Sequence, residues 1–211
     1  MFFPFRIGAA AAAAALIALL ADAGETGTLA GRVDLRVAGS SIASVSPLVA
    51  FLDGIDGPLD YVPPADVPRI SQKNARFAPE FLSIAAGQSV EMPNDDAIFH
   101  NVFSFSKPNH FDLGLYGRGE SRNVTFAHPG VVRIYCSIHA SMNATIFVAP
   151  SPWHARVGPS GLFELGEVKP GRYRLRLWSP FLPEESRDIE IVAGRRTSVE
   201  ITIAAAPSER R

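Results

Sequence analysis

The sequence predicts an all-β protein. After the first 23 residues, apolar and polar residues alternate with a period of two in most segments, and helical periodicity is scarce. In the segment RYRLRLW, Tyr173, Leu175 and Leu177 share one face of the expected strand, and arginines take the other. Turns rich in glycine and proline, such as PSG, KPG and AG, separate these short segments. Together these observations are typical of β-sandwiches.

The first expected strands lie before residue 62. GRVDLRV places Val33, Leu35 and Val37 on one face and charged residues on the other. PLVAFLDG is a shorter apolar run, which predicts a more buried strand. The following segment, GIDGPLDYVPPADVP, contains glycines and prolines that cannot continue a strand interior, so it predicts a linker or long loop.

Two further series of strands are expected. Between residues 69 and 149 the candidate strands are FLSIAAG, SVEMPN, FHNVFSFS, SRNVTFAHPG, VVRIYC and ATIFVA. After Pro150 they are LFELGEV, RYRLRLW, SRDIEIVAG and TSVEITIA. The last residues, 205–211, predict a flexible tail.

Residues 1–23 have the layout of a secretory signal. Arg6 precedes an apolar run that extends to Ala21, and the small-x-small triplet that ends at Ala23 predicts cleavage after that residue. The alternative is an uncleaved membrane anchor, but an apolar run of about 15 residues falls short of the roughly 20 that span a bilayer. We therefore expect a periplasmic protein without stable membrane insertion.

The charge balance and the single cysteine limit which classes of function the sequence supports. With 20 basic and 21 acidic residues the net charge is −1, which gives no reason to expect a nucleic-acid partner. An exported protein with one cysteine, Cys136, cannot form an internal disulfide. That thiol is then free, paired with another molecule, or bound to a metal. Because an exported free thiol is liable to oxidation, a metal-bound thiolate is the favoured interpretation.

The residues around Cys136 suggest which metal. Cys136 ends the strand VVRIYC, and His139 and Met142 lie in the loop that follows. His100 begins another strand after the turn PNDDA, and two strand ends at the same pole of a sandwich can meet. Two imidazoles, a thiolate and a weak thioether form the ligand set of blue-copper sites. The alternative is that Cys136 and Met142 are ordinary packing residues.

The same residues resemble a known family. PNDDAIFHNVFSF, followed 36 positions after its histidine by C-x2-H-x2-M, resembles the cupredoxins, and amicyanin most of all. Over residues 69–149 the resemblance implies a Greek-key β-sandwich that holds one type 1 copper ion. His100 and His139 would be the imidazole ligands, Cys136 the thiolate and Met142 the axial ligand. Asn101 matches the asparagine that ties the two ligand loops together. The wider context looks like a bacterial group often labelled methylamine utilization or plastocyanin-like proteins.

A second resemblance concerns the flanking segments. ARVGPSGLFELGEVKPGRYRLRLWSP resembles the carboxypeptidase regulatory-like, transthyretin-type β-sandwich. The first two strands of that pattern match GRVDLRV and LVAFLDG, which lie before the copper block. We therefore expect residues 27–62 and 153–204 to form one discontinuous sandwich; the alternative is that 27–62 adds strands to the copper domain. This sandwich carries no catalytic constellation, and we expect it to dock the copper domain to a partner or to the cell surface.

The expected function is the shuttling of single electrons by a Cu(I)/Cu(II) couple, with an unidentified redox partner protein and no enzyme activity. A copper oxidase or copper nitrite reductase needs more histidines, often as H-x-H pairs, and only His110, His128 and His154 remain. Two alternatives stay open: a copper delivery or storage protein, and a structural or interaction β-protein without a redox role. A methionine-rich delivery protein is disfavoured because the chain has only three methionines.

Overall fold

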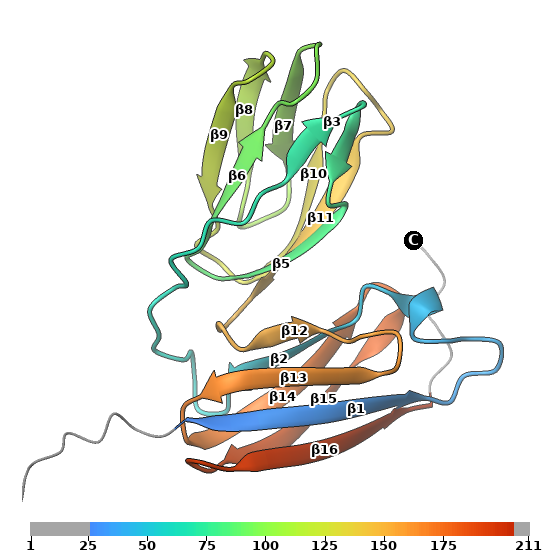
Figure 1. The fold of residues 1–211 in the computed structure, drawn as a ribbon, viewed down its shortest axis with the longest axis vertical. Helices are drawn as coiled ribbons and strands as arrows, with labels where there is room; N and C mark the ends of the chain where they lie inside the picture. The colour runs from blue at the N-terminus through green and yellow to red at the C-terminus, as the bar shows by residue number, and fades with distance from the viewer. Residues whose placement is uncertain (1–25, 205–211) are drawn as a thin grey trace, which may run out of the picture.

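The computed structural model describes residues 26–204, and this part of the chain forms two stacked β-units (Figure 1). We call them the upper unit, which contains β3 to β11, and the lower unit, which contains β1, β2 and β12 to β16. The predicted signal sequence, 1–23, and the predicted tail, 205–211, lie outside the described residues. Within 26–204, no helix has the length and apolar character needed to cross a membrane.

The upper unit is a sandwich built around a five-stranded sheet. Its order is β5 (Phe81–Ala85), β11 (Asn143–Ala149), β10 (Gly130–Tyr135), β7 (His100–Ser104) and β8 (Phe111–Tyr116). The opposite layer holds the pair β6 (Ser89–Pro93) and β9 (Ser121–Thr125) and the hairpin β3 (Ser71–Lys73) and β4 (Arg76–Ala78). Isolated bridges between Gln72 and Asn94 and between Arg69 and Glu91 join these two pairs.

Alternation along the strands forms the core of the upper unit. In β10, Val132 and Ile134 are buried, whereas the side chain of Arg133 between them is exposed. Cys136 continues the inward series beyond the end of the strand and is 5% exposed. Cys136 therefore lies in the core cluster of the upper unit, as does Met142.

The lower unit has two sheets. One has the order β13 (Leu162–Val168), β1 (Gly27–Leu35) and β16 (Arg196–Ile203), and the other has the order β12 (His154–Arg156), β2 (Val49–Gly54), β14 (Gly171–Ser179) and β15 (Leu182–Ile191). A short 3-10 turn, η1 (Ala43–Val45), lies between β1 and β2. In β14 the side chains of Tyr173, Leu175 and Leu177 are buried in the core between the sheets, as their alternation predicts. Strands from both ends of the described chain thus share these two sheets.

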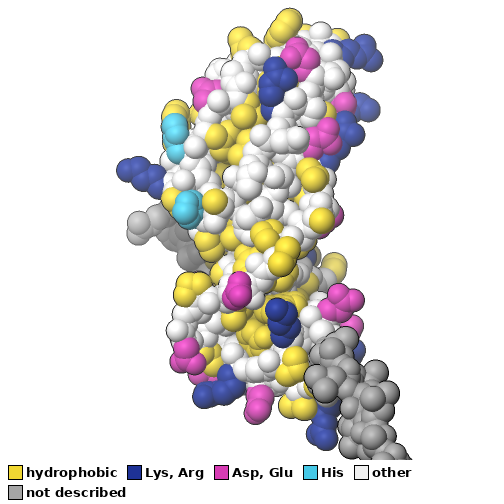
Figure 2. Space-filling view, turned by 90° about the vertical axis from the view of Figure 1, so that its left-hand side faces the viewer, with side chains coloured by type: hydrophobic (Ala, Val, Ile, Leu, Met, Phe, Trp, Pro, Cys, Tyr) yellow, Lys and Arg dark blue, Asp and Glu magenta, His cyan; other side chains and the backbone are white. Residues whose placement is uncertain are grey.

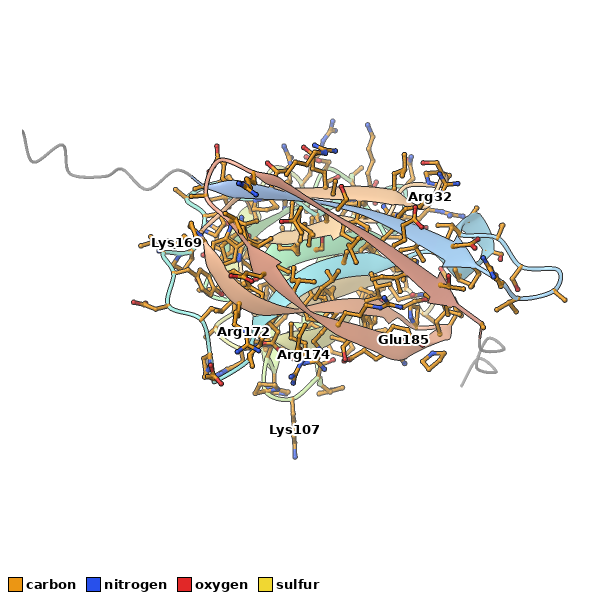
Figure 3. The ribbon with its side chains drawn as sticks, turned by 90° about the horizontal axis from the view of Figure 1, so that it is seen from below. Arg32, Lys107, Lys169, Arg172, Arg174 and Glu185 are labelled. Atoms are coloured by element: carbon orange, nitrogen blue, oxygen red, sulfur yellow. The ribbon has the colours of Figure 1, made fainter. Side chains whose placement is uncertain are left out.

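The outer surface of the lower unit is charged. Figure 3, which looks at the molecule from below, shows Arg172 and Arg174 of β14 on one side and Arg32 of β1 on the other. Arg174 pairs with Asp188 of the neighbouring strand β15, at 2.9 Å. Both side chains of this pair are about half exposed, so it contributes little to stability.

An apolar cluster joins the two units. It contains Val49 and Phe51 of β2 and Phe147 and Ala149 of β11, with Phe81, Val131 and Trp178 packed against them. We call this set the interface cluster. The ring of Phe147 lies 4.7 Å from that of Trp178 and 5.2 Å from that of Phe51. Apolar side chains are visible at the waist between the units in Figure 2.

The candidate site lies far from this interface. The loop between β10 and β11 is at the end of the upper unit that points away from the lower unit (Figure 1). The start of β7, which carries His100, lies at the same end. The interface cluster and the candidate ligands therefore occupy opposite ends of the upper unit.

Candidate metal centre

The loop after β10 carries three of the predicted ligands: Cys136, His139 and Met142. The backbone N–H of Cys136 donates to the carbonyl of Met142, at 3.2 Å, and the N–H of Met142 donates to the carbonyl of His139, at 2.9 Å. These bonds close the loop on itself, so Cys136 and His139 are held close together. His139 is partly buried, and Met142 is 1% exposed in the same core cluster as Cys136.

His100 approaches the loop from the first residue of β7. Its side chain is completely buried, and its Nδ1 lies 3.7 Å from Sγ of Cys136. Nδ1 of His139 lies 3.8 Å from the same sulfur. The three donor atoms all lie within 4.8 Å of one another. The structure therefore brings together three of the predicted ligands, with both imidazoles presenting Nδ1 to the sulfur.

Asn101 ties the two ligand segments together. Its Oδ1 accepts hydrogen bonds from the backbone N–H of Ser137, at 2.7 Å, and from the Ser137 hydroxyl, at 2.8 Å. Asn101 follows His100 and Ser137 follows Cys136, so these bonds fix the spacing of the two ligands. Asn101 is only 5% exposed, so water has little access to these hydrogen bonds and cannot easily replace them.

Replacing Asn101 with alanine tests this connection. We expect Asn101→Ala to lower the free energy of unfolding by about 2 kcal/mol, because both hydrogen bonds that Ser137 donates to the Asn101 side chain are lost. Urea unfolding of the metal-free protein measures the change. Asn109→Ala is the control, because Asn109 donates to the carbonyl of His128 at the exposed surface. Equal losses in the two variants would contradict a special role for Asn101.

Asp96 is a site residue that the sequence analysis did not identify. Its Oδ2 lies 2.8 Å from Nε2 of His100, the ring nitrogen that faces away from the cysteine. The backbone N–H groups of Asn74 and Ala75 donate to the same carboxylate, at 2.6 and 2.8 Å. Desolvation acts to raise the pKa of Asp96, but hydrogen bonds from Ala75, His100 and Asn74 outweigh it and lower that pKa. Asp96 therefore stays ionised against the imidazole.

A buried polar network supports the loop that carries Asp96. Nδ2 of Asn94 donates to the carbonyls of Ile98 and Tyr116, each at 2.9 Å, and its Oδ1 accepts from the N–H of Asp96, also at 2.9 Å. The Tyr116 hydroxyl donates to the carbonyl of Met92, and burial raises the pKa of Tyr116 to about 12. The only sequence signal for this network was the turn PNDDA, whose spacing does not reveal which side chains turn inward.

The remaining histidines do not join the centre. His110 and His128 are exposed, and His154 lies on β12 in the lower unit. Within residues 26–204, His100, Cys136 and His139 form the one close group of histidine, cysteine and acidic side chains suited to a metal ion. A thiolate with two imidazoles fits copper by the softness of its donors.

Comparison with known proteins supports the same family likeness. No family model matches the chain. The chloroplastic plastocyanin of Physcomitrium patens is 34% identical over 85 residues, which cover 35% of this chain and 50% of the plastocyanin. A part of the chain is cupredoxin-like in fold. The match spans only about half the length of the plastocyanin.

Solved structures with partial similarity include two cupredoxins. A purple cupredoxin from Nitrosopumilus maritimus aligns over 39% of this chain and 99% of its own, at 23% identity and a TM-score of 0.35. Amicyanin from Paracoccus versutus aligns over 46% of this chain and 90% of its own, at 21% identity and a TM-score of 0.36.

Proposed function

We propose that this protein is a periplasmic type 1 copper protein that carries single electrons. His100, Cys136, His139 and Met142 would hold one copper ion, which when bound supplies the Cu(II)/Cu(I) couple. The observation that carries the proposal is the approach of two imidazole Nδ1 atoms to one buried sulfur, at 3.7 and 3.8 Å. Hydrogen bonds through Asn101 hold the ligand segments in place. The ligands would therefore move little when the copper ion changes between Cu(II) and Cu(I).

The surroundings of His139 suggest where the electron would leave. His139 is only partly buried, and its neighbour Ile138 is 52% exposed. Phe99, directly before His100, is 62% exposed, and Leu115, which pairs with Asn101, is 59% exposed. Where exposed apolar side chains form a contiguous patch, they mark a contact surface. We propose that a redox partner protein binds here, within reach of His139.

The alternative copper-binding functions fit this site less well. A delivery or storage protein needs ligands that exchange, whereas Cys136 and His100 are buried. Hydrogen bonds of His100 to Asp96 and of Ser137 to Asn101 hold their two segments in place. We propose no enzyme activity. We also propose that residues 1–23 are a signal peptide and that the protein belongs to the methylamine utilization group. The lower unit, in this proposal, is a carboxypeptidase regulatory-like sandwich. The lower unit would dock the copper domain to its partner or to the cell surface.

The visible spectrum tests the proposed function. With one equivalent of Cu(II), we expect an intense absorption band at about 600 nm, the region of copper–thiolate charge transfer. Cys136→Ala should abolish the band, because the thiolate is then missing. His128→Ala is the matched control, since His128 is exposed and outside the site, and it should retain the band.

Reversibility separates electron transfer from copper delivery. An electron carrier should give a reversible one-electron wave in voltammetry and keep its copper in the presence of a chelator. Rapid loss of copper to the chelator would favour delivery or storage. A wild-type protein that stays colourless and binds no copper would contradict both copper functions and leave the structural alternative.

A further inference from the structure

Asp96 connects the candidate ligand His100 to a hairpin of the opposite layer. The strands β3 and β4 pair at Lys73 and Arg76, with Asn74 and Ala75 as the two-residue turn between them. Both turn residues have positive φ, 55° and 51°, as two-residue hairpin turns of the favoured type require. Their two N–H groups point at the Asp96 carboxylate, at 2.6 and 2.8 Å. The carboxylate is thereby held in one orientation.

This orientation determines which nitrogen of His100 carries the proton. A carboxylate only accepts hydrogen bonds, so Nε2 of His100, at 2.8 Å from Oδ2, must donate. In the neutral ring Nδ1 is then unprotonated, and this is the nitrogen that lies 3.7 Å from Sγ of Cys136. The lone pair of the imidazole therefore faces the position that a metal ion would share with the thiolate.

The carboxylate also brings a negative charge to the site. Its hydrogen bonds come from two backbone amides and from His100, and its side chain is only 13% exposed. The neighbouring Asp95 differs, because Arg69 pairs with both of its oxygens at 3.1 Å and its side chain is 39% exposed. The charge of Asp96 is thus screened less, and it stabilises the more positive oxidation state of a metal bound by His100.

We propose that Asp96 is a positioning residue of the copper site, which holds His100 with Nδ1 free for the metal and favours Cu(II) over Cu(I). This inference rests on the proposed copper function, and it adds a determinant of the reduction potential. Asp96 acts through His100 and does not itself bind the metal. The β3–β4 turn is part of the device, because its two N–H groups fix the carboxylate.

Two substitutions with the same change of net charge test the proposal. Asp96→Asn keeps an acceptor oxygen for His100 but removes the charge, whereas Asp95→Asn removes the charge of the Arg69 pair. We expect Asp96→Asn to shift the ratio of Cu(I) to Cu(II) affinity about tenfold towards Cu(I), which raises the potential by about 59 mV in voltammetry. Asp95→Asn should change the potential much less. Equal potentials in the two variants would overturn the electrostatic role, even if Asp96→Asn unfolds at a lower temperature.

The tautomer of His100 provides a second measurement that needs no copper. Nitrogen-15 NMR of the metal-free protein should show His100 protonated at Nε2 in the wild type. Asp96→Ala, which removes the acceptor, should give a mixture of tautomers. A wild type protonated at Nδ1, or an unchanged tautomer in Asp96→Ala, would overturn the positioning role. If the wild type shows no copper–thiolate band, the proposed function fails, and the NMR result still decides the role of Asp96.

Discussion

Phe147→Ala is expected to lower the free energy of unfolding by about 3–4 kcal/mol. Phe147 is 5% exposed, and its ring packs between Trp178 and Phe51 of the lower unit. Removing the ring leaves a cavity at the centre of the interface cluster. Its neighbours in β11, Ile146 and Val148, face the core of the upper unit and keep their contacts. The loss should therefore fall on the junction between the units.

Urea unfolding followed by circular dichroism measures this effect. Phe105→Ala is the matched control, because Phe105 is 72% exposed, and its removal should cost less than about 1 kcal/mol. The copper spectrum of Phe147→Ala should be unchanged, since the candidate ligands lie at the other end of the upper unit. Equal losses of unfolding free energy in the two variants would show that the interface cluster contributes little to stability.

The interface also predicts how the molecule unfolds. While the interface cluster is intact, opening one unit exposes apolar surface of the other, which favours a single unfolding transition. Phe147→Ala weakens this coupling, so the two units should separate into two transitions if each is stable alone. Such a separation would indicate that the interface cluster, and not the chain connections, makes the two units cooperate.

The all-β fold was predictable because strand alternation is a local property. The alternation of β14 predicted that Tyr173, Leu175 and Leu177 share a face, and all three are buried. The opposite face of the same strand was not predictable to the same extent. Trp178 lies there and packs against Phe147 of the upper unit, at 4.7 Å. The alternation of residues along a strand shows which side chains share a face, but it does not show what covers that face.

The candidate site shows the same limit. The motif C-x2-H-x2-M and the distant His100 were found from residue type and spacing, and the structure brings His100, Cys136 and His139 together. Asp96 was not found, although it lies four residues before His100. Its role depends on a turn in another hairpin, whose N–H groups orient the carboxylate. Contacts of this kind depend on the layer packing of the sandwich and leave no spacing pattern in the sequence.

Acid is expected to destabilise the protein through His154, in the lower unit. Nδ1 of His154 is buried and has no hydrogen-bond partner. Burial lowers the pKa of His154 to about 4, although the charge of Asp66 acts in the opposite direction. In the unfolded chain the pKa is about 6.5. Between these values the unfolded state binds a proton that the folded state does not bind. Stability from this residue is therefore fully present above about pH 6.5 and declines as the pH falls to about 4.

The difference between the two pKa values corresponds to about 3 kcal/mol. Other acidic groups also titrate in this range, so the wild type must be compared with His154→Leu, which cannot take up the proton. We expect the stability of the wild type relative to His154→Leu to fall by about 3 kcal/mol between pH 7 and pH 4, as measured by urea unfolding. His128→Leu, at an exposed histidine, should follow the wild type at every pH. Parallel stability profiles for the wild type and His154→Leu would show that the imidazole gains a proton without cost, and that His154 is not sealed against solvent in the folded state.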